Sequence, residues 1–138
     1  MSVYITTTGI HRLVLRSSDL ARSRRFYIGM LGFPLALEGP HVFLFLVGDT
    51  AVEVRGPAPL EAVHEAFNLF RAGLDRIALA CTDEQELTRV ADALSRAAIA
   101  HTGVRIDQAL ERKYVAFEDP DLIGWELGCA HNQPRCQR

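Results

Sequence analysis

The chain has 138 residues, of which 49% are hydrophobic and 23% charged, so it has enough apolar material for one globular domain with a core. Fifteen Lys and Arg residues against 17 Asp and Glu give a formal net charge of -2, which argues against nucleic acid as a partner. The longest apolar runs, such as residues 42–47, fall far short of the roughly 20 residues that span a bilayer.

The first eight residues lack the charged and apolar regions of a signal peptide. The three cysteines form no C-x-x-C pair and are scattered along the chain, which favours reduced thiols over a disulfide framework or a zinc site. We therefore expect a cytoplasmic protein with no membrane partner.

An internal repeat organises the chain. Residues 9–15 and 73–79 are similar, lie 64 residues apart, and each lead through two polar residues to an aspartate. Each copy combines alternating apolar residues with a helix start, where Ser18 and Thr82 are the expected N-caps and Gln85 completes a capping box with Thr82. The repeat predicts a strand followed by a helix, twice.

Helical spacing of apolar residues follows each start. In the first half Leu20, Tyr27 and Leu31 mark the buried side, and Gly32 is the expected end of the helix. In the second half the apolar face is longer and consists of Leu87, Val90, Ala91, Leu94 and Ala98.

Three short strand-like runs follow each helix. They cover residues 33–38, 41–47 and 50–55 in the first half, and residues 100–106, 113–118 and 123–128 in the second. Between the halves, residues 59–72 have apolar residues at helical spacing and predict a connecting helix, on which His64 is a surface or packing residue. The expected organisation is a first module at about 9–57, the linker helix at 59–72, a second module at about 73–129 and a polar tail at 130–138.

Two sets of motifs resemble a known family. The first module contains Asp19-Leu20-x-x-Ser23-x-x-Phe26-Tyr27 and Leu31-Gly32-Phe33, and the second contains Asp119-Pro120-Asp121 followed by Trp125-Glu126-Leu127. Together they resemble the vicinal oxygen chelate superfamily, which includes glyoxalase I, extradiol dioxygenases, fosfomycin-resistance enzymes and bleomycin-resistance proteins. The resemblance implies an α+β fold of two tandem βαβββ modules, with cupped, open mixed sheets, helices outside and the functional site on the concave face.

The resemblance also implies a ligand set, which this chain only half retains. Enzymes of the superfamily usually place His or Gln, Glu, His and Glu around one divalent metal. Glu53 and Glu126 match the carboxylates of the last strands, whereas the first-strand positions, seven residues before each helix-opening aspartate, are Arg12 and Arg76. Arginine has no lone pair for a metal ion, so no metal cofactor is expected. Zn, Ni, Mn or Fe held by His11, Glu53 and Glu126 is the alternative.

His11 is adjacent to the position that the resemblance singles out. Neighbouring side chains of a strand point to opposite faces, so His11 faces away from the cup if Arg12 faces into it, unless a bulge shifts the register. His41 and His101 each lie near the start of a strand and are expected to be exposed or hydrogen-bonded rather than catalytic. Arg105, on a strand of the second module, is a further candidate for ligand binding.

The two arginines and two glutamates are expected to pair by bidentate hydrogen bonds. Such a group can clamp a carboxylate, phosphate or enolate-like oxygen of an otherwise apolar ligand, or it can simply fill a former metal cavity. The aromatic residues that we expect to line the cup are Phe43, Phe45, Tyr114 and Phe117.

The favoured function is therefore a metal-free small-molecule binding protein of the bleomycin-resistance kind, with a ligand that carries negative charge. The alternative is a glyoxalase-like lyase or dioxygenase-like oxidoreductase in which Glu53 or Glu126 is a general base and an arginine stabilises an oxyanion. A regulatory or interaction module is the third hypothesis, and no motif supports it. We expect a homodimer, because two-module members of the superfamily commonly pair and open sheet edges favour association.

Overall fold

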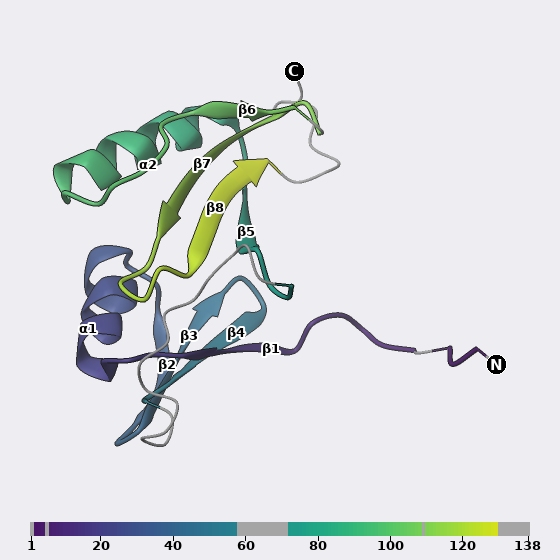
Figure 1. Cartoon of the computed structure of the whole chain (residues 1–138), viewed down its shortest axis with the longest axis vertical. Helices are drawn as coiled ribbons and strands as arrows, with labels where there is room; N and C mark the ends of the chain where they lie inside the picture. The colour runs from purple at the N-terminus through teal and green to yellow at the C-terminus, as the bar shows by residue number, and fades with distance from the viewer. Residues whose placement is uncertain (1, 5, 58–71, 109, 130–138) are drawn as a thin grey trace. The chain divides into compact units, whose positions relative to one another are not determined.

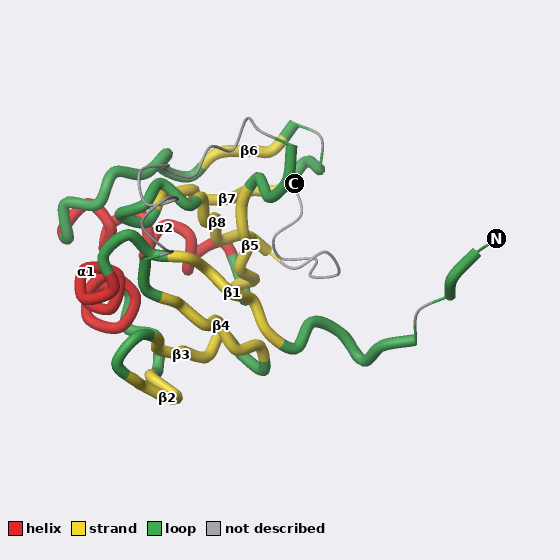
Figure 2. The backbone as a smooth tube through the Cα atoms, turned by 60° about the horizontal axis from the view of Figure 1, so that its bottom comes forward, coloured by secondary structure: helices red, strands yellow, loops and turns green. Residues whose placement is uncertain are grey.

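The computed structural model describes residues 2–4, 6–57, 72–108 and 110–129. The chain divides into two compact units, residues 1–64 and 65–138, and each contains a four-stranded sheet with a helical segment on one face (Figures 1 and 2). Each unit runs strand, helix and three strands, which confirms the predicted α+β fold of tandem βαβββ modules. None of the helices in the described ranges combines the length and apolar character needed to span a bilayer.

The first unit contains four strands and one helical segment that changes character along its length. Its elements are β1 (Arg12–Arg16), α1 (Leu20–Arg24), the π-helical η1 (Arg25–Met30), β2 (Leu35–Gly39), β3 (Val42–Val47) and β4 (Thr50–Arg55). The strand order is β1-β4-β3-β2, in which β1 runs parallel to β4 and the other neighbours are antiparallel.

The helical segment of the first unit begins one residue later than predicted. Asp19 is the N-cap instead of Ser18, because its side chain accepts a hydrogen bond from the Arg22 backbone N–H at 3.1 Å. The segment ends where the Leu31 N–H donates to the Phe26 carbonyl at 2.9 Å, a bond to the fifth residue back that is characteristic of a π-helix.

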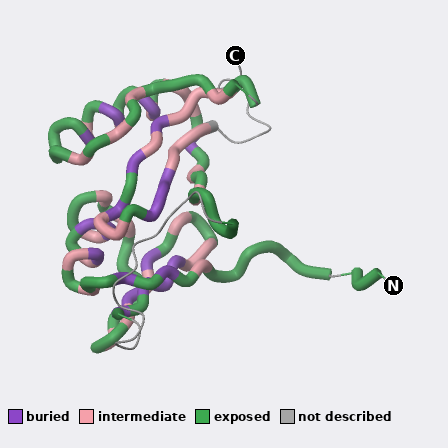
Figure 3. The backbone as a smooth tube through the Cα atoms, in the orientation of Figure 1, coloured by how far each residue is buried: buried purple, intermediate pink, exposed green. Residues whose placement is uncertain are grey.

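Aromatic stacking holds the first helical segment against its sheet. Tyr27 is fully buried and stacks on Phe45 of β3, with the ring centroids 4.9 Å apart. Cross-strand partners place Phe43 beside Val54 and Phe45 beside Val52, and all four side chains are buried (Figure 3). The side of the sheet that faces the helix is therefore the core of the unit. The charged candidate residues lie at the alternating positions of the strands and face the other side.

The second unit repeats the pattern with a longer helix. Its elements are β5 (Arg76–Cys81), α2 (Glu84–Arg96), β6 (Arg105–Asp107), β7 (Arg112–Glu118) and β8 (Gly124–Cys129). The strand order is β5-β8-β7-β6, and β5 runs parallel to β8. Trp125, fully buried, lies between Ile77 and Phe117 in the sheet register and forms the centre of the core.

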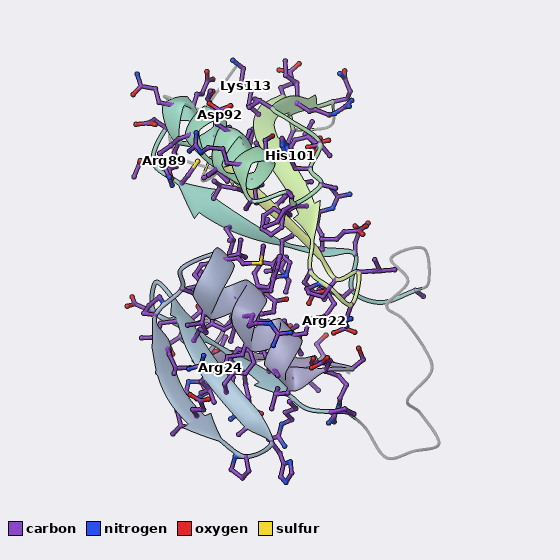
Figure 4. The ribbon with its side chains drawn as sticks, turned by 90° about the vertical axis from the view of Figure 1, so that its left-hand side faces the viewer. Arg22, Arg24, Arg89, Asp92, His101 and Lys113 are labelled. Atoms are coloured by element: carbon purple, nitrogen blue, oxygen red, sulfur yellow. The ribbon has the colours of Figure 1, made fainter. Side chains whose placement is uncertain are left out.

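Helix α2 is also capped one residue later than predicted. Asp83 accepts the Glu86 N–H at 3.1 Å, so Thr82 is not the cap and the predicted capping box with Gln85 is wrong. The helix buries Leu87, Ala91 and Leu94, as its spacing predicts. Lys113 of β7 donates to Glu84 at 2.9 Å and ties the sheet to the first turn of the helix (Figure 4).

The strand predicted at 100–106 is shorter in the structure. Only Arg105–Asp107 forms a strand, while His101 makes an isolated bridge to Phe117. The ladder is interrupted by Gly103, which has a φ of +70°, and by the Thr102 hydroxyl, which accepts the Ala116 N–H at 3.0 Å.

The predicted linker helix at 59–72, with His64, and the tail at 130–138 fall almost wholly outside the described residues.

A buried aspartate organises the turn between β7 and β8. Asp119 is 5% exposed, and its Oδ1 accepts the N–H groups of Asp121 at 2.8 Å and Ile123 at 2.9 Å. We expect Asp119→Ala to lower the free energy of unfolding by about 2 kcal/mol, since a buried N–H group loses its acceptor. Urea denaturation measures the change, and Asp92→Ala, on the exposed side of α2 (Figure 4), is the control. Equal effects of the two substitutions would contradict this role of Asp119.

Candidate functional site

Glu53 is the buried carboxylate of the first unit. It lies in the middle of β4, between Val14 of β1 and Leu44 of β3, on the face opposite the aromatic core. Its side chain is 5% exposed. Arg12 Nη1 lies 3.2 Å from one carboxylate oxygen, and Arg55 Nε donates to the other.

The two guanidinium groups make the burial of Glu53 tolerable. A carboxylate removed from water loses several kcal/mol of hydration, which only close and well-directed partners offset. Each arginine serves a different oxygen, and the two side chains remain 45% and 52% exposed, so they keep much of their own hydration. The trio therefore holds a fixed geometry, with both guanidinium groups directed by one carboxylate.

Glu126 is the equivalent carboxylate of the second unit, and it is held more loosely. It lies in β8 between Ala78 of β5 and Ala116 of β7, and its side chain is 19% exposed. Arg76 Nη1 is 3.5 Å from a Glu126 oxygen, whereas Arg76 Nε donates to Asp75 at 3.0 Å. Arg76 is thus shared between two acidic groups and bonds more closely to Asp75.

The electrostatics of the second unit reflect this sharing. Burial raises the pKa of the Glu126 carboxyl; Arg76 acts in the opposite direction, and the nearby Asp107 and Asp75 reinforce the increase. The hydrogen bond to Asp75 is the main reason that the pKa of Arg76 is raised. Glu126 therefore binds a proton more tightly than a glutamate in water does.

The raised pKa of Glu126 predicts how the stability of the protein depends on pH. Because the pKa of Glu126 is raised on folding, the folded chain binds a proton more tightly than the unfolded chain does. The resulting stabilisation is complete below the ordinary glutamate pKa of about 4.3 and is lost as pH rises through the raised value. Glu126→Gln should thus gain stability relative to the unmodified protein between pH 4 and pH 7 in urea titrations. If the difference in the free energy of unfolding between the variant and the unmodified protein shrinks or reverses as the pH rises over this interval, the prediction is wrong.

The Glu126 face of the second sheet carries two hollows. A hollow of about 200 Å³ is bordered by Ala80, Tyr114, Glu126 and Gly128. A second, of about 450 Å³, is bordered by Arg76, by the small residues Ala116 and Gly124, by His101, Thr102 and Phe117, and by the acidic residues Asp75, Glu118 and Asp119. Small residues leave space above the strands, and a Cβ at Gly124 would lie only 3.3 Å from the Cβ of Arg76. This face offers room for a small molecule beside the ion pair.

The structure places two of the four aromatic candidates away from the carboxylate face. Phe43 and Phe45 belong to the helix-facing core, whereas Phe117, beside Trp125 at 7% exposure, also borders the larger hollow. The cross-strand partner of each phenylalanine is adjacent in sequence to Glu53 or Glu126. Neighbouring residues of a strand point to opposite faces, so each of these rings starts from the face opposite the carboxylate. Tyr114 does share the face of Glu126, as its pairing with Gly128 shows.

The histidine candidates are placed as follows. His11 precedes β1 and is exposed, and His41 is exposed next to β3. His101 Nδ1 accepts the Gly103 N–H at 2.9 Å, so its proton is on Nε2, 2.7 Å from Ser95 Oγ. With that tautomer His101 has no lone pair directed at Ser95, and the pair is not a nucleophile with its base.

Two partners of the candidate site were not identified in the sequence. Arg55 was overlooked, although Glu53 and Arg55 are two residues apart in a strand and must share a face. Asp75 precedes Arg76 directly, and no periodicity rule predicts that such neighbours will bond.

Arg105, a candidate for ligand binding, shares the face of Tyr114, and its Nε donates to the Thr102 carbonyl at 3.1 Å.

The carboxylates at the implied metal-ligand positions already have cationic partners. Both carboxylates at the implied ligand positions are engaged by guanidinium groups, which carry positive charge and offer no lone pair. Across the described residues, no group of three or more His, Cys, Asp and Glu side chains has the arrangement to hold a metal.

Comparisons with known proteins define the family. The profile of the Glyoxalase/Bleomycin resistance protein/Dioxygenase superfamily matches residues 9–127, and the chain belongs to this superfamily. No curated protein matches the sequence significantly.

Many solved structures share the fold. The glyoxylase/bleomycin resistance protein/dioxygenase domain from Frankia sp. EAN1pec aligns with a TM-score of 0.74 at 22% identity, covering 91% of this chain and 99% of that one. The glyoxalase family protein from Enterococcus faecalis has a TM-score of 0.71 at 21% identity and covers 88% and 97%. Lactoylglutathione lyase from Agrobacterium tumefaciens has a TM-score of 0.71 at 17% identity and covers 91% and 96%. At these identities the likeness concerns the fold alone.

Proposed function

We propose that the protein binds a small molecule without a metal ion and does not convert it. The observation that carries this proposal is the pairing of Glu53 with Arg12 and Arg55, and of Glu126 with Arg76, at the positions where the superfamily places metal ligands. A metal ion would have to displace these guanidinium groups and then lie beside their positive charge.

The chemistry of the face indicates how such a ligand is held. Guanidinium groups donate in a planar fork that suits carboxylate and phosphate oxygens, and the hollows beside Arg76 and Glu126 accept an apolar body. The small floor residues Ala78, Ala116 and Gly124 leave this space open without a rearrangement of the sheet.

The first test is the metal content of the purified protein. We expect less than stoichiometric Zn, Ni, Mn and Fe after dialysis, because both carboxylates at the implied ligand positions are paired with guanidinium groups. Elemental analysis measures the content. A near-molar amount of one metal, lost in Glu53→Ala or Glu126→Ala, would overturn the metal-free proposal and restore His11, Glu53 and Glu126 as candidate ligands.

One observation favours a second function, an enzyme with Glu126 as general acid or base. Glu126 has a long ion pair, partial exposure and a raised pKa, while its partner Arg76 is within reach of an oxyanion on the same face. Such an enzyme would lose turnover in Glu126→Gln while retaining ligand binding. Equal binding and no turnover in both the unmodified protein and the variant favour the binding function.

A further inference from the structure

Three arginines share one face of the first sheet. Arg12 and Arg16 lie on β1, four residues apart, and therefore point to the same side as Val14. Arg55, on the adjacent parallel strand, is the direct register partner of Arg16. We call Arg12, Arg16 and Arg55 the arginine cluster.

The cluster carries more positive charge than its acidic partner balances. Glu53 binds Arg12 through one oxygen and Arg55 through the other. Arg16 Nη1 instead donates to the neutral carbonyl of Gly56 at 2.9 Å. Among the described residues, Glu53 is the acidic side chain in contact with the cluster, so three positive charges face one negative charge.

This surplus has an electrostatic cost in the unliganded sheet. Like charges directly opposite one another on neighbouring strands are destabilising, and Arg16 and Arg55 occupy such positions. Each guanidinium has five N–H donors, of which the protein uses only a few, and the Arg12 and Arg55 side chains are about half exposed. An oxyanion at this face would relieve the repulsion and use the remaining donors.

The arrangement of the arginine cluster is not a consequence of the repeat. At the 64-residue offset, Arg16 corresponds to Ala80, and the residue two after Glu126 is Gly128 instead of arginine. Arg76, the equivalent of Arg12, contacts both Asp75 and Glu126. In the second unit Arg76 is shared between two carboxylates, whereas in the first unit Glu53 is shared between two arginines and Arg16 lies opposite one of them.

We propose that the arginine cluster binds the oxyanion group of a small ligand, and that this group is a dianionic phosphoryl group. The surplus of two positive charges matches a phosphoryl dianion better than a single carboxylate. Tetrahedral oxygens also accept from guanidinium groups in different planes, whereas a carboxylate offers one plane. Glu53 positions Arg12 and Arg55, and Arg16 completes the cluster. The inference rests on the proposed function, since it assigns the charged group of a ligand that is bound without a metal ion.

The test is calorimetric titration of the full-length protein with inorganic phosphate, and separately with acetate, at constant ionic strength. We expect phosphate to bind more tightly than acetate. Arg16→Gln and Arg55→Gln should each weaken phosphate binding by about tenfold or more, as expected for the loss of one charge-assisted contact. Arg16 does not contact Glu53, so Arg16→Gln leaves the buried carboxylate paired and is the variant expected to fold normally.

Arg24→Gln is the matched control. Arg24 lies on α1 of the same unit and pairs with Glu38 at 2.9 Å, away from the sheet face (Figure 4), so the variant removes one positive charge without touching the cluster. Equal phosphate affinity in Arg16→Gln and in the unmodified protein, or equal losses in Arg16→Gln and Arg24→Gln, would overturn the proposal. Acetate binding as tight as phosphate would overturn the phosphoryl assignment.

Titration of the same samples with Ni²⁺ separates this inference from the proposed function. Stoichiometric Ni²⁺ binding would refute the metal-free function, whatever the phosphate result. No Ni²⁺ binding together with phosphate binding that is insensitive to Arg16→Gln would refute the arginine cluster alone.

Discussion

Removal of both Arg12 and Arg55 as alanine variants is expected to lower the free energy of unfolding by about 3 kcal/mol. The reason is that Glu53, at 5% side-chain exposure, would remain buried with neither of its partners. Each single substitution should cost only about 1 kcal/mol, because the other guanidinium still satisfies one oxygen of the carboxylate. The effects are therefore expected to be non-additive, as is found for groups in one network.

A third substitution identifies the cause of the loss. If the buried charge is responsible, Glu53→Gln added to the double variant should restore about half of the lost stability, since a neutral amide is cheaper to bury than an unpaired carboxylate. Urea denaturation followed by circular dichroism measures all four variants. Additive losses, or no recovery on adding Glu53→Gln, would show that the three side chains do not act as a unit.

The second unit provides an internal comparison. Glu126 is 19% exposed and already shares Arg76 with Asp75, so Arg76→Ala should cost less than the double substitution in the first unit. We therefore expect the loss in the free energy of unfolding to follow the burial of the carboxylate rather than the mere presence of an ion pair.

The fold could be predicted largely from local pattern. The 64-residue repeat predicted a strand and then a helix at the start of each unit, although β1 and β5 begin three residues later than residues 9 and 73, and the alternation in 50–55 gave the bounds of β4 correctly. The helix starts were wrong by one residue because the side chains of Asp19 and Asp83, and not those of the hydroxyl residues before them, accept the N–H groups of Arg22 and Glu86. The strand at 100–106 was predicted too long, since the interruption at Gly103 depends on a positive φ that propensity does not specify.

The candidate site was harder to predict, because it depends on register between strands. The facing of Arg16 and Arg55 follows from the parallel pairing of β1 with β4, two strands that are distant in sequence. Phe43 and Phe45 were assigned to the wrong face for the same reason, although their pairing with Val54 and Val52 is unambiguous once the sheet is formed. Single-strand alternation tells which residues share a face, and the sheet decides which face is covered by the helix.

The largest functional change is expected from Arg12→His combined with Arg76→His. Each substitution places an imidazole at the start of a strand whose neighbour carries a carboxylate, Glu53 or Glu126. An imidazole beside a carboxylate is a ligand pair that suits Zn, Ni or Fe, and the unmodified protein has a guanidinium group at each of these positions. We expect the double variant to gain Ni²⁺ binding at least about tenfold tighter than that of the unmodified protein.

A matched control separates this gain from binding by surface histidines. The control is Arg24→His combined with Arg89→His, which adds the same number of imidazoles. Both arginines lie on helices (Figure 4), and each pairs with a glutamate: Arg24 with Glu38 and Arg89 with Glu86. Calorimetry with Ni²⁺ should detect tight binding in the Arg12→His, Arg76→His protein and none in the control. Equal affinities would mean that Arg12 and Arg76 do not occupy metal-ligand positions, and the assignment of the site would fail while the fold assignment would stand.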